Sequence, residues 1–342
     1  MPAIVIGMVF MKIALRVSPV AVLPSAAGEG ASEIPGLLDF FLRLIPSNPF
    51  AAAAEGALLP LIVFTLLVGA AAGALAEERR QRLITLAEDI SEMFMRLIHW
   101  ILWTAPLGVF GLAAPVMAQM GLGLLASLAV FVVTVVIGLF VFMALFYLPA
   151  VRFLGGKGVG EFIRGVVATY TIGFSTTSSV ASLPVLFEDA RALGVSPQVS
   201  SLVLSLGAAI NRAGSALFQA AVVVFLAALY GHSLPTTALI SAGAVGFVVA
   251  MSVAPVPSAS IVTLAPILEA AGVPVAGLGI LLGIDRIPDM FRSATNITGH
   301  VAAAVTVEGI VGSTGSASNP GEARQREPEE NLAASGPPTP KP

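Results

Sequence analysis

The segment IDRIPDMFRSATNITGH, residues 284–300, decides the fold class, because it places ionised side chains inside a long apolar stretch. It lies between GVPVAGLGILLG and VAAAVTVEGIVG, which hold a single acidic residue. At about 100° of rotation per residue, one narrow face of a helix here carries Asp285, Asp289, Arg292, Asn296 and His300. A charge near the bilayer centre costs at least about 2.5–3.5 kcal/mol on insertion scales, so we expect this face to line a functional interior.

The composition is that of a polytopic membrane protein. Of the 342 residues, 56% are hydrophobic and 11% are charged, whereas soluble domains carry about 25% charged residues. A net charge of −3 gives no indication of a nucleic-acid partner. The chain has no cysteine and its three histidines lie far apart, so disulfides and thiolate metal sites are excluded and no metal motif is present.

Hydropathy divides the chain into four parts, at residues 1–22, 23–121, 122–310 and 311–342. The first is expected to be the last part of a transmembrane helix, and the fourth, rich in Pro, Gly, Ser and Glu, is expected to be disordered. The second part contains a Gly/Ser-containing loop, an amphipathic segment and a first clear span. The third part is expected to contain a long helix, a hairpin, a helix, a second hairpin and a last helix, at residues 122–155, 158–195, 197–231, 236–273 and 274–310.

Polar or proline-rich breaks interrupt the apolar segments of the second half. These are FSTTSSVASLP (174–184), NRAGS (211–215) and MSVAPVPSAS (251–260). In hydrocarbon an unpaired backbone group costs several kcal/mol, so irregular backbone lies inside protein or against a wet cavity. Broken helices around a polar cavity are typical of secondary transporters. The alternative is that the Ser/Thr run only bonds back to helix carbonyls.

The basic residues indicate the orientation in the membrane. EERRQR (77–82) and the basic residues of 152–164 fall on one side, and the positive-inside bias puts that side in the cytoplasm. Arg191 stays on the same side only if residues 158–195 dip into the membrane and return. We therefore expect a multi-pass protein of the cell (inner or plasma) membrane, with its C-terminus in the cytoplasm.

The charged face suits an anionic ligand. Asp289 and Arg292 lie three residues apart and could simply neutralise each other, but this leaves the rest of the polar face unexplained. A zwitterion or a dicarboxylate fits better, with an ammonium at Asp289 and a carboxylate at Arg292, whose planar fork matches that group. Enzymatic catalysis is poorly supported, because Ser178 and Ser179 have no base nearby in the sequence.

Four stretches together resemble the glutamate/aspartate transporter homologues, the dicarboxylate/amino acid:cation symporters. They are IPSNPFAAAAEG (45–56), FSTTSSVASLP, LGAAINRAGSALFQ (206–219) and GIDRIPDMFRSATNITG (283–299). The resemblance runs from about residue 40 to 308. It implies an all-α polytopic fold with two re-entrant helical hairpins and interrupted transmembrane helices. It also implies a homotrimer in the lipid bilayer, with scaffold helices in 23–121 and an elevator-like transport domain in 122–310.

The resemblance also assigns roles to residues. It implies that Asp289 binds the amino group, Arg292 the side-chain carboxylate, and Ser293 and Asn296 the backbone of an acidic amino acid or dicarboxylate. The remaining substrate contacts that it implies are Thr177, Ser178, Ser179, Ser215, Pro255 and Val256. Members selective for C4-dicarboxylates usually lack an aspartate at the position of Asp289, so its presence favours glutamate or aspartate.

The departures from the family pattern concentrate on cation binding. Asn211-Arg212-Ala213-Gly214-Ser215 stands in place of Asn-Met-Asp-Gly-Thr, and His300 replaces a second aspartate. Two lost carboxylates and a new arginine favour proton over sodium coupling, because a hard cation needs oxygen ligands. Candidates for coupling a cation or proton are Gly207, Asn211, Arg212, Asp285 and His300; we expect no other cofactor.

Several alternatives stay open at this point. Arg212 is either a tethered cation in place of sodium or a side chain that snorkels away. His300 either titrates during transport or only caps carbonyls near a helix end. The family's first helices are missing, so we expect either a misplaced start codon or a remnant. The leading hypothesis is a symporter, and the competing one is a non-transporting or uncoupled substrate-binding relic.

Overall fold

The computed structural model describes residues 1–20, 22, 45–54, 58–102, 104–251, 253 and 258–318. Over these residues the chain is helical and contains no β-strand, which confirms the all-α prediction. Two stretches are long and apolar enough to cross a membrane, Gly123–Leu154 and Pro197–Leu229. Shorter apolar helices cover Val63–Gly73 and Thr236–Met251.

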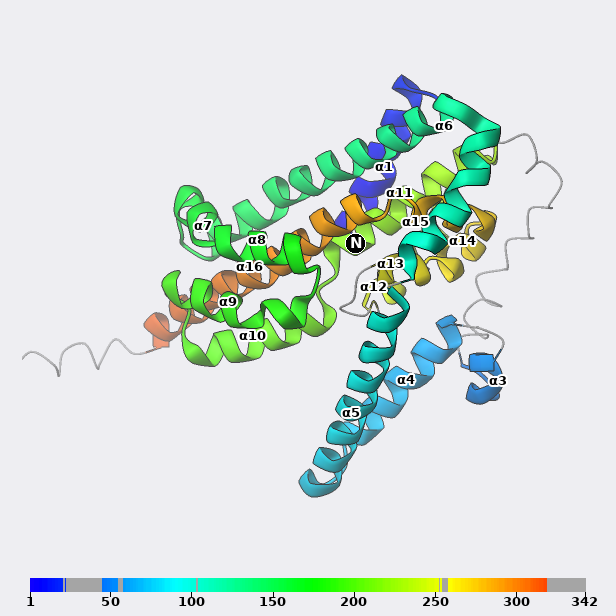
Figure 1. Cartoon of the computed structure of the whole chain (residues 1–342). Coiled ribbons are helices and arrows are strands. Elements are labelled where there is room, and N and C mark those ends of the chain that lie inside the picture. Colours follow the sequence, from blue (N-terminus) through cyan, green and yellow to red (C-terminus); the bar gives the residue numbers. More distant parts are fainter. Residues whose placement is uncertain are drawn as a thin grey trace, which may run out of the picture.

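The first half of the described chain consists of long helices and two π-helical segments. Their bounds are α1 Pro2–Val17, α3 Pro49–Ala54, α4 Leu58–Gly73, α5 Glu77–Leu102, α6 Ala105–Phe142, η1 Met143–Tyr147 and η2 Ala150–Leu154. Figure 1 shows α4 and α5 as a neighbouring pair that projects away from the other helices. α5 and α6 are separated at the TAPLG sequence. α6 then continues across residues 121 and 122, where the hydropathy placed a boundary.

The segment 158–195 folds back on itself. α7 (Val159–Gly165) and α8 (Val167–Thr176) lead to a short turn, and α9 (Ser179–Ala192) returns alongside α8. Thr177 adopts a left-handed conformation, with φ of 52°, at the end of α8. Such a conformation costs a β-branched residue about 1–3 kcal/mol and is found mostly at functional sites. The side-chain oxygen of Ser178 accepts the N–H of Ala181 and caps α9.

The next two segments are also interrupted. α10 (Pro197–Ile210) and α11 (Ala213–Leu229) are separated by Asn211 and Arg212. α12 (Thr236–Met251) is followed, after a region outside the described residues, by α13 (Ala259–Val262) and α14 (Ala265–Ala270). Asn and Ser favour helix ends over helix interiors, because their side chains compete for backbone groups.

The last helical region begins with η3 (Val275–Gly277) and α15 (Leu278–Leu282), and continues as α16 (Arg286–Ser318). α16 extends into the segment 311–342 as far as Ser318, and the disorder expected of that segment stays a prediction. Residues 319–342 lie outside the described residues. Figure 1 shows α16 running beside α8 and α11.

Two hydrophobic clusters hold these helices together. The larger one centres on α11, which is buried along nearly its whole length against α1, α6, α12 and α14. Met11 of α1, Phe131 of α6 and Phe225 of α11 lie fully buried within it. The smaller cluster joins α7, α9, α10 and α16 around Phe162, Leu186 and Leu204. The start of α16 contacts both clusters, and its Asp289 and Arg292 side chains are buried, whereas the Arg286 side chain is largely exposed.

Glycines allow the backbones to approach closely at the far end of α16. A Cβ atom on Gly309 would come within 2.7 Å of the Gly155 Cα, and a Cβ on Gly155 would come within 2.9 Å of Val305 Cγ1. Gly312, in the same helix, has nothing within 4 Å of its Cβ position. The contact between η2 and α16 therefore depends on Gly309 and Gly155, and not on glycine content in general.

Replacing Gly309 by alanine is expected to destabilise the protein by about 1–3 kcal/mol, because backbone atoms must move to admit the methyl group. Gly312→Ala is the matched control and is expected to be neutral or stabilising by up to about 1 kcal/mol through helix propensity. Thermal unfolding in detergent measures both. Equal unfolding midpoints for the two variants would show that the close approach is absent.

Candidate functional site

Three interrupted segments contact the first half of α16. Arg286 donates to Thr177, Asp289 accepts the N–H of Ser258, and Asn296 accepts the N–H of Gly214, just after the break at Asn211–Arg212. Asp285 lies immediately before the helix. The carbonyl of Asp285 accepts the N–H of Asp289 at 2.8 Å, so the backbone already turns as a helix there. Pro288 lies in the first turn of α16, where its missing N–H removes no helical bond.

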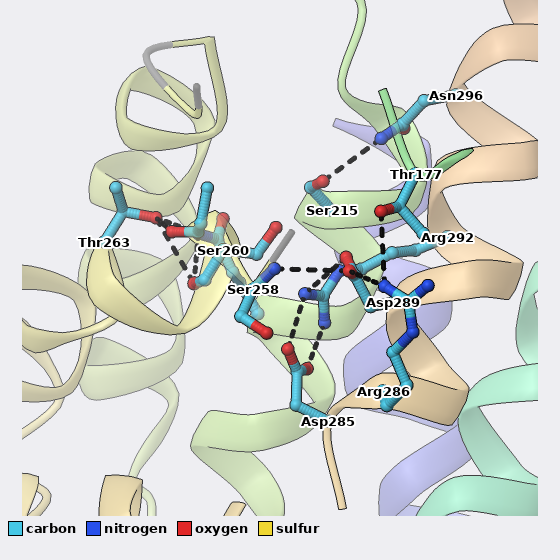
Figure 2. A network of polar contacts seen from close by, with 12 residues as sticks. Thr177, Ser215, Ser258, Ser260, Thr263, Asp285, Arg286, Asp289, Arg292 and Asn296 are labelled. Atoms are coloured by element: carbon cyan, nitrogen blue, oxygen red, sulfur yellow. Dashed lines mark hydrogen bonds and ion pairs between the residues drawn. The ribbon is translucent and has the colours of Figure 1, made fainter. Parts of the chain in front are cut away.

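Arg292 is the centre of the charged cluster. Its side chain is 1% exposed, and Nη1 and Nη2 donate to Asp285 Oδ1 and Oδ2 at 2.6 and 3.0 Å. Nη2 also lies 2.9 Å from Asp289 Oδ1. Figure 2 shows the guanidinium held between the two carboxylates. The Phe218 ring, 4.2 Å from the guanidinium carbon, adds a cation–π contact that fixes its plane.

Asp289 connects α16 to the second break. Its Oδ2 accepts the backbone N–H of Ser258 at 3.2 Å, across from α16 in Figure 2. Ser258 has φ of 60°, a left-handed conformation that aims this N–H at the carboxylate. Arg286 Nη1 lies 4.0 Å from the same oxygen and donates to Thr177 Oγ1 at 3.4 Å. Asp289 therefore contacts the Ser258 turn directly and the Thr177 turn through Arg286.

Asn296 binds the first turn of α11. Its Oδ1 accepts the N–H of Gly214 at 2.7 Å, and its Nδ2 donates to Ser215 Oγ at 3.1 Å. A Cβ on Gly214 would come within 2.6 Å of the Arg292 carbonyl, so only glycine allows this approach. The amide thus satisfies a free N–H at the start of α11.

His300, Gly207 and Asn211 form a second group, one helix turn further along α16. His300 is fully buried, and its Nε2 lies 3.4 Å from the Asn211 carbonyl oxygen. Gly207 packs on the ring, since a Cβ there would lie 3.1 Å from Cδ2. Because α16 continues to Ser318, His300 does not cap its own helix end. That alternative is wrong, although the ring does contact a carbonyl of the α10–α11 break.

Arg212 is buried in the same break, and its side chain points away from His300. It is 6% exposed, and it donates to the Ala208 carbonyl, Ser179 Oγ and the Val253 carbonyl. The alternative in which Arg212 snorkels to the surface is therefore wrong. Asp285, the remaining coupling candidate, lies in the charged cluster and pairs with Arg292.

The residues predicted to contact substrate do not share one partner in the structure. Thr177 meets Arg286, Ser178 caps α9, Ser179 meets Arg212, and Ser293 is half-buried on α16. Pro255 and Val256 lie outside the described residues. Among the described residues no group of three or more His, Cys, Asp or Glu side chains could hold a metal ion.

Sequence reasoning missed three contributors. Phe218 supports Arg292, Ser258 contacts Asp289 through its backbone, and Arg286 approaches both Asp289 and Thr177. Arg286 had a signal, because Arg286 and Asp289 are separated by three residues on a helix. A backbone N–H has no residue-specific signal, and the partner of a buried aromatic ring cannot be read from one sequence.

The arrangement can bind an anionic or zwitterionic solute. Asp285, Asp289, Arg286 and Arg292 sum to no net charge when all are ionised. A carboxylate that enters can share the Arg292 fork with Asp285, and an ammonium can take Asp289. Arg292, buried between two aspartates, is compensated, whereas an unpaired charge there would be strongly destabilising.

Comparison with known proteins identifies the family. The model of the sodium:dicarboxylate symporter family matches residues 1–310. The proton/glutamate-aspartate symporter of Escherichia coli (strain K12) is 34% identical over 272 residues, covering 80% of this chain and 62% of that protein. The proton/sodium-glutamate symport protein of Bacillus subtilis (strain 168) is 32% identical over 296 residues, covering 86% and 68%.

A C4-dicarboxylate transport protein of Cupriavidus necator is 30% identical over 302 residues, covering 86% of this chain and 68% of that protein. The chain therefore spans between 62% and 68% of the length of these three relatives. The match over residues 1–310 confirms the resemblance carried by the four motifs. The chain belongs to the sodium:dicarboxylate symporter family, a family of membrane transporters.

Proposed function

We propose that the protein is a secondary active transporter of acidic amino acids or C4-dicarboxylates, driven by protons rather than sodium. The observation that carries the proposal is the buried Arg292, held by Asp285 and Asp289 where two helix turns approach α16. Ionised groups at such a position are kept for a ligand or for ion movement. Family membership and the names of the three relatives support the same class of solute.

An acidic amino acid fits the cluster better than a C4-dicarboxylate. Asp289 is the acidic group that Arg292 shares with Ser258 and Arg286, whereas Asp285 is committed to Arg292 through both oxygens. Asp289 is therefore the carboxylate that can exchange a partner for a ligand ammonium. A dicarboxylate offers no ammonium and leaves Asp289 facing a second negative charge.

Proton coupling is supported by the residues around the α10–α11 break. Ala213 and His300 replace carboxylates of the family pattern, so the break has lost anionic ligands for sodium. His300 is buried, and its Nδ1 has no hydrogen-bond partner within the described chain. A buried imidazole whose ordinary pKa lies near neutrality can change its charge when the site opens to water.

A second candidate is a member of the family that binds a solute without coupled transport. Arg212, buried in the break where it bonds both turns, favours this candidate, because a fixed cation there cannot dissociate. Uptake and binding measured separately on the same preparation distinguish the two. The homotrimer and the two-domain division stay predictions of the family resemblance, and the cytoplasmic C-terminus stays a prediction from the placement of basic residues.

Uptake of labelled aspartate, glutamate and succinate into proteoliposomes tests the proposal. Accumulation is expected under an imposed pH gradient and not under a sodium gradient alone. Binding without accumulation under either gradient would favour the second candidate. Absence of both binding and uptake would overturn the proposed solute class.

Replacing Asp289 by asparagine is expected to weaken aspartate binding by about 10- to 100-fold. A hydrogen bond to a charged group contributes about 1.5–3 kcal/mol, and about 1.4 kcal/mol corresponds to a factor of ten. Succinate binding is expected to be unchanged or tighter, since a negative charge is removed beside Arg292. Calorimetry or equilibrium binding in detergent gives both affinities.

Glu188→Gln makes the same chemical change at an exposed position of α9 and is the matched control, expected to alter neither affinity. Equal losses of aspartate and succinate binding in Asp289→Asn would contradict the assignment of Asp289 to the ligand ammonium.

Replacing His300 by asparagine is expected to abolish uptake driven by a pH gradient, because asparagine cannot titrate. Binding of aspartate at fixed pH should survive, since His300 contacts Asn211 and not the Arg292 cluster. The control is His232→Asn, in the loop after α11. Unchanged pH-driven uptake in His300→Asn would exclude His300 as the proton carrier.

A further inference from the structure

Within the described part of the chain, Arg212 is a buried cation without an acidic partner. Its side chain lies in the α10–α11 break, is 6% exposed, and takes part in none of the ion pairs found among the described residues. By contrast, Arg292 is neutralised by two aspartates. Burying an unpaired charge is strongly unfavourable unless polar groups solvate it. The contacts of Arg212 therefore identify what replaces water around it.

Neutral oxygens surround the guanidinium. Nη1 donates to Ser179 Oγ at 2.6 Å, Nη2 to the Ala208 carbonyl at 3.0 Å, and Nε to the Val253 carbonyl at 3.2 Å. Carbonyl and hydroxyl oxygens are the ligands that hard cations take from proteins. Ala208 lies at the end of α10, Ser179 at the start of α9, and Val253 just after α12. The oxygens thus come from three interrupted segments.

We propose that Ser179, Ala208 and Val253 form a cation site that the chain fills with its own Arg212. The guanidinium fastens the segment after α12 to the first hairpin and to the broken helix. Holding Val253 against the first hairpin therefore needs no dissolved cation at this position. We call the bonds of Arg212 to Ser179, Ala208 and Val253 the latch. Its consequence for transport rests on the proposed function, whereas the bonds themselves are a property of the protein without substrate.

The position of the latch explains how it acts on the ligand site. Val253 and Ser258 lie on either side of residues 254–257. Arg212 holds the Val253 carbonyl, and Asp289 holds the Ser258 N–H, which faces it in Figure 2. A ligand ammonium competes for Asp289 but not for Arg212. Val253 can thus stay bound to Arg212 while the Ser258 N–H exchanges its partner.

The chain has no cysteine, so spin labels can be attached to introduced cysteines alone, and pulsed electron–electron double resonance can measure the distance between them. Spin labels on cysteines at Val180, in the first turn of α9, and Val262, in α13, replace side chains that are 56% and 66% exposed. The distance distribution between them reports how far the segment after α12 lies from the first hairpin. No substrate is needed.

The doubly labelled protein that keeps Arg212 is expected to give one narrow distance distribution, which is the same in sodium chloride and in choline chloride. Arg212→Ala leaves an empty site, and its distribution should broaden and move to longer distances. Millimolar guanidinium should restore the narrow distribution in Arg212→Ala. Guanidinium should have no effect on Arg212→Met, which removes the charge but fills the space. Arg164→Ala, at an exposed position of α7, is the control and should match the unmodified site.

Ser179→Ala removes one oxygen without unpairing a charge, so it serves if the Arg212 variants fail to fold, and it should give a broadened distribution. Two results would overturn the proposal. One is a distribution that sodium narrows when Arg212 is present. The other is an unchanged distribution in folded Arg212→Ala or Ser179→Ala. The distance measurements need no aspartate uptake, so the two proposals are tested separately. Failure of uptake would not contradict the Arg212 contacts, and an unchanged distance distribution would not contradict the proposed transport.

Discussion

The Arg292 ion pairs are the constraint on which the rest of the site depends. A guanidinium at 1% exposure needs both Asp285 and Asp289, and each carboxylate needs the guanidinium in return. This requirement fixes the start of α16 relative to α11, where Phe218 and the first turn support it. It also leaves Asp289 as the group through which α16 reaches the segment around Ser258. The charge cluster is therefore both a structural centre and the candidate binding site.

The broken helices follow from the same physics. Backbone N–H and C=O groups freed at a break need partners inside the protein. Here the partners are side chains of α16 and of one other break: Asn296 and Asp289 of α16 accept the N–H groups of Gly214 and Ser258, and Arg212 donates to the Val253 carbonyl. The interruptions therefore stabilise one another, and they gather at one place because none could be satisfied alone.

Much of this was predictable from the sequence and some of it was not. The polar face of the last helix and the breaks at FSTTSS and NRAGS are visible, because helical period and turn-forming residues are local properties. The partner of Arg292 was harder: spacing favoured Asp289, whereas the two-pronged contact goes to Asp285, which lies outside the regular helix. Composition indicates disorder after residue 310, and the described part of α16 ends at Ser318 within that segment. Contacts through the backbone, as at Ser258, depend on folding and leave no residue signature.

The packing of Gly207 on His300 has a consequence for how the sequence can drift. A methyl group at position 207 would press on the imidazole, with its Cβ at 3.1 to 3.3 Å from three ring and side-chain carbons. A smaller side chain at position 300 removes that pressure, and a bulkier one at 207 then becomes acceptable. The side chain accepted at position 207 therefore depends on the one at position 300, and glycine is required at 207 while the imidazole is present.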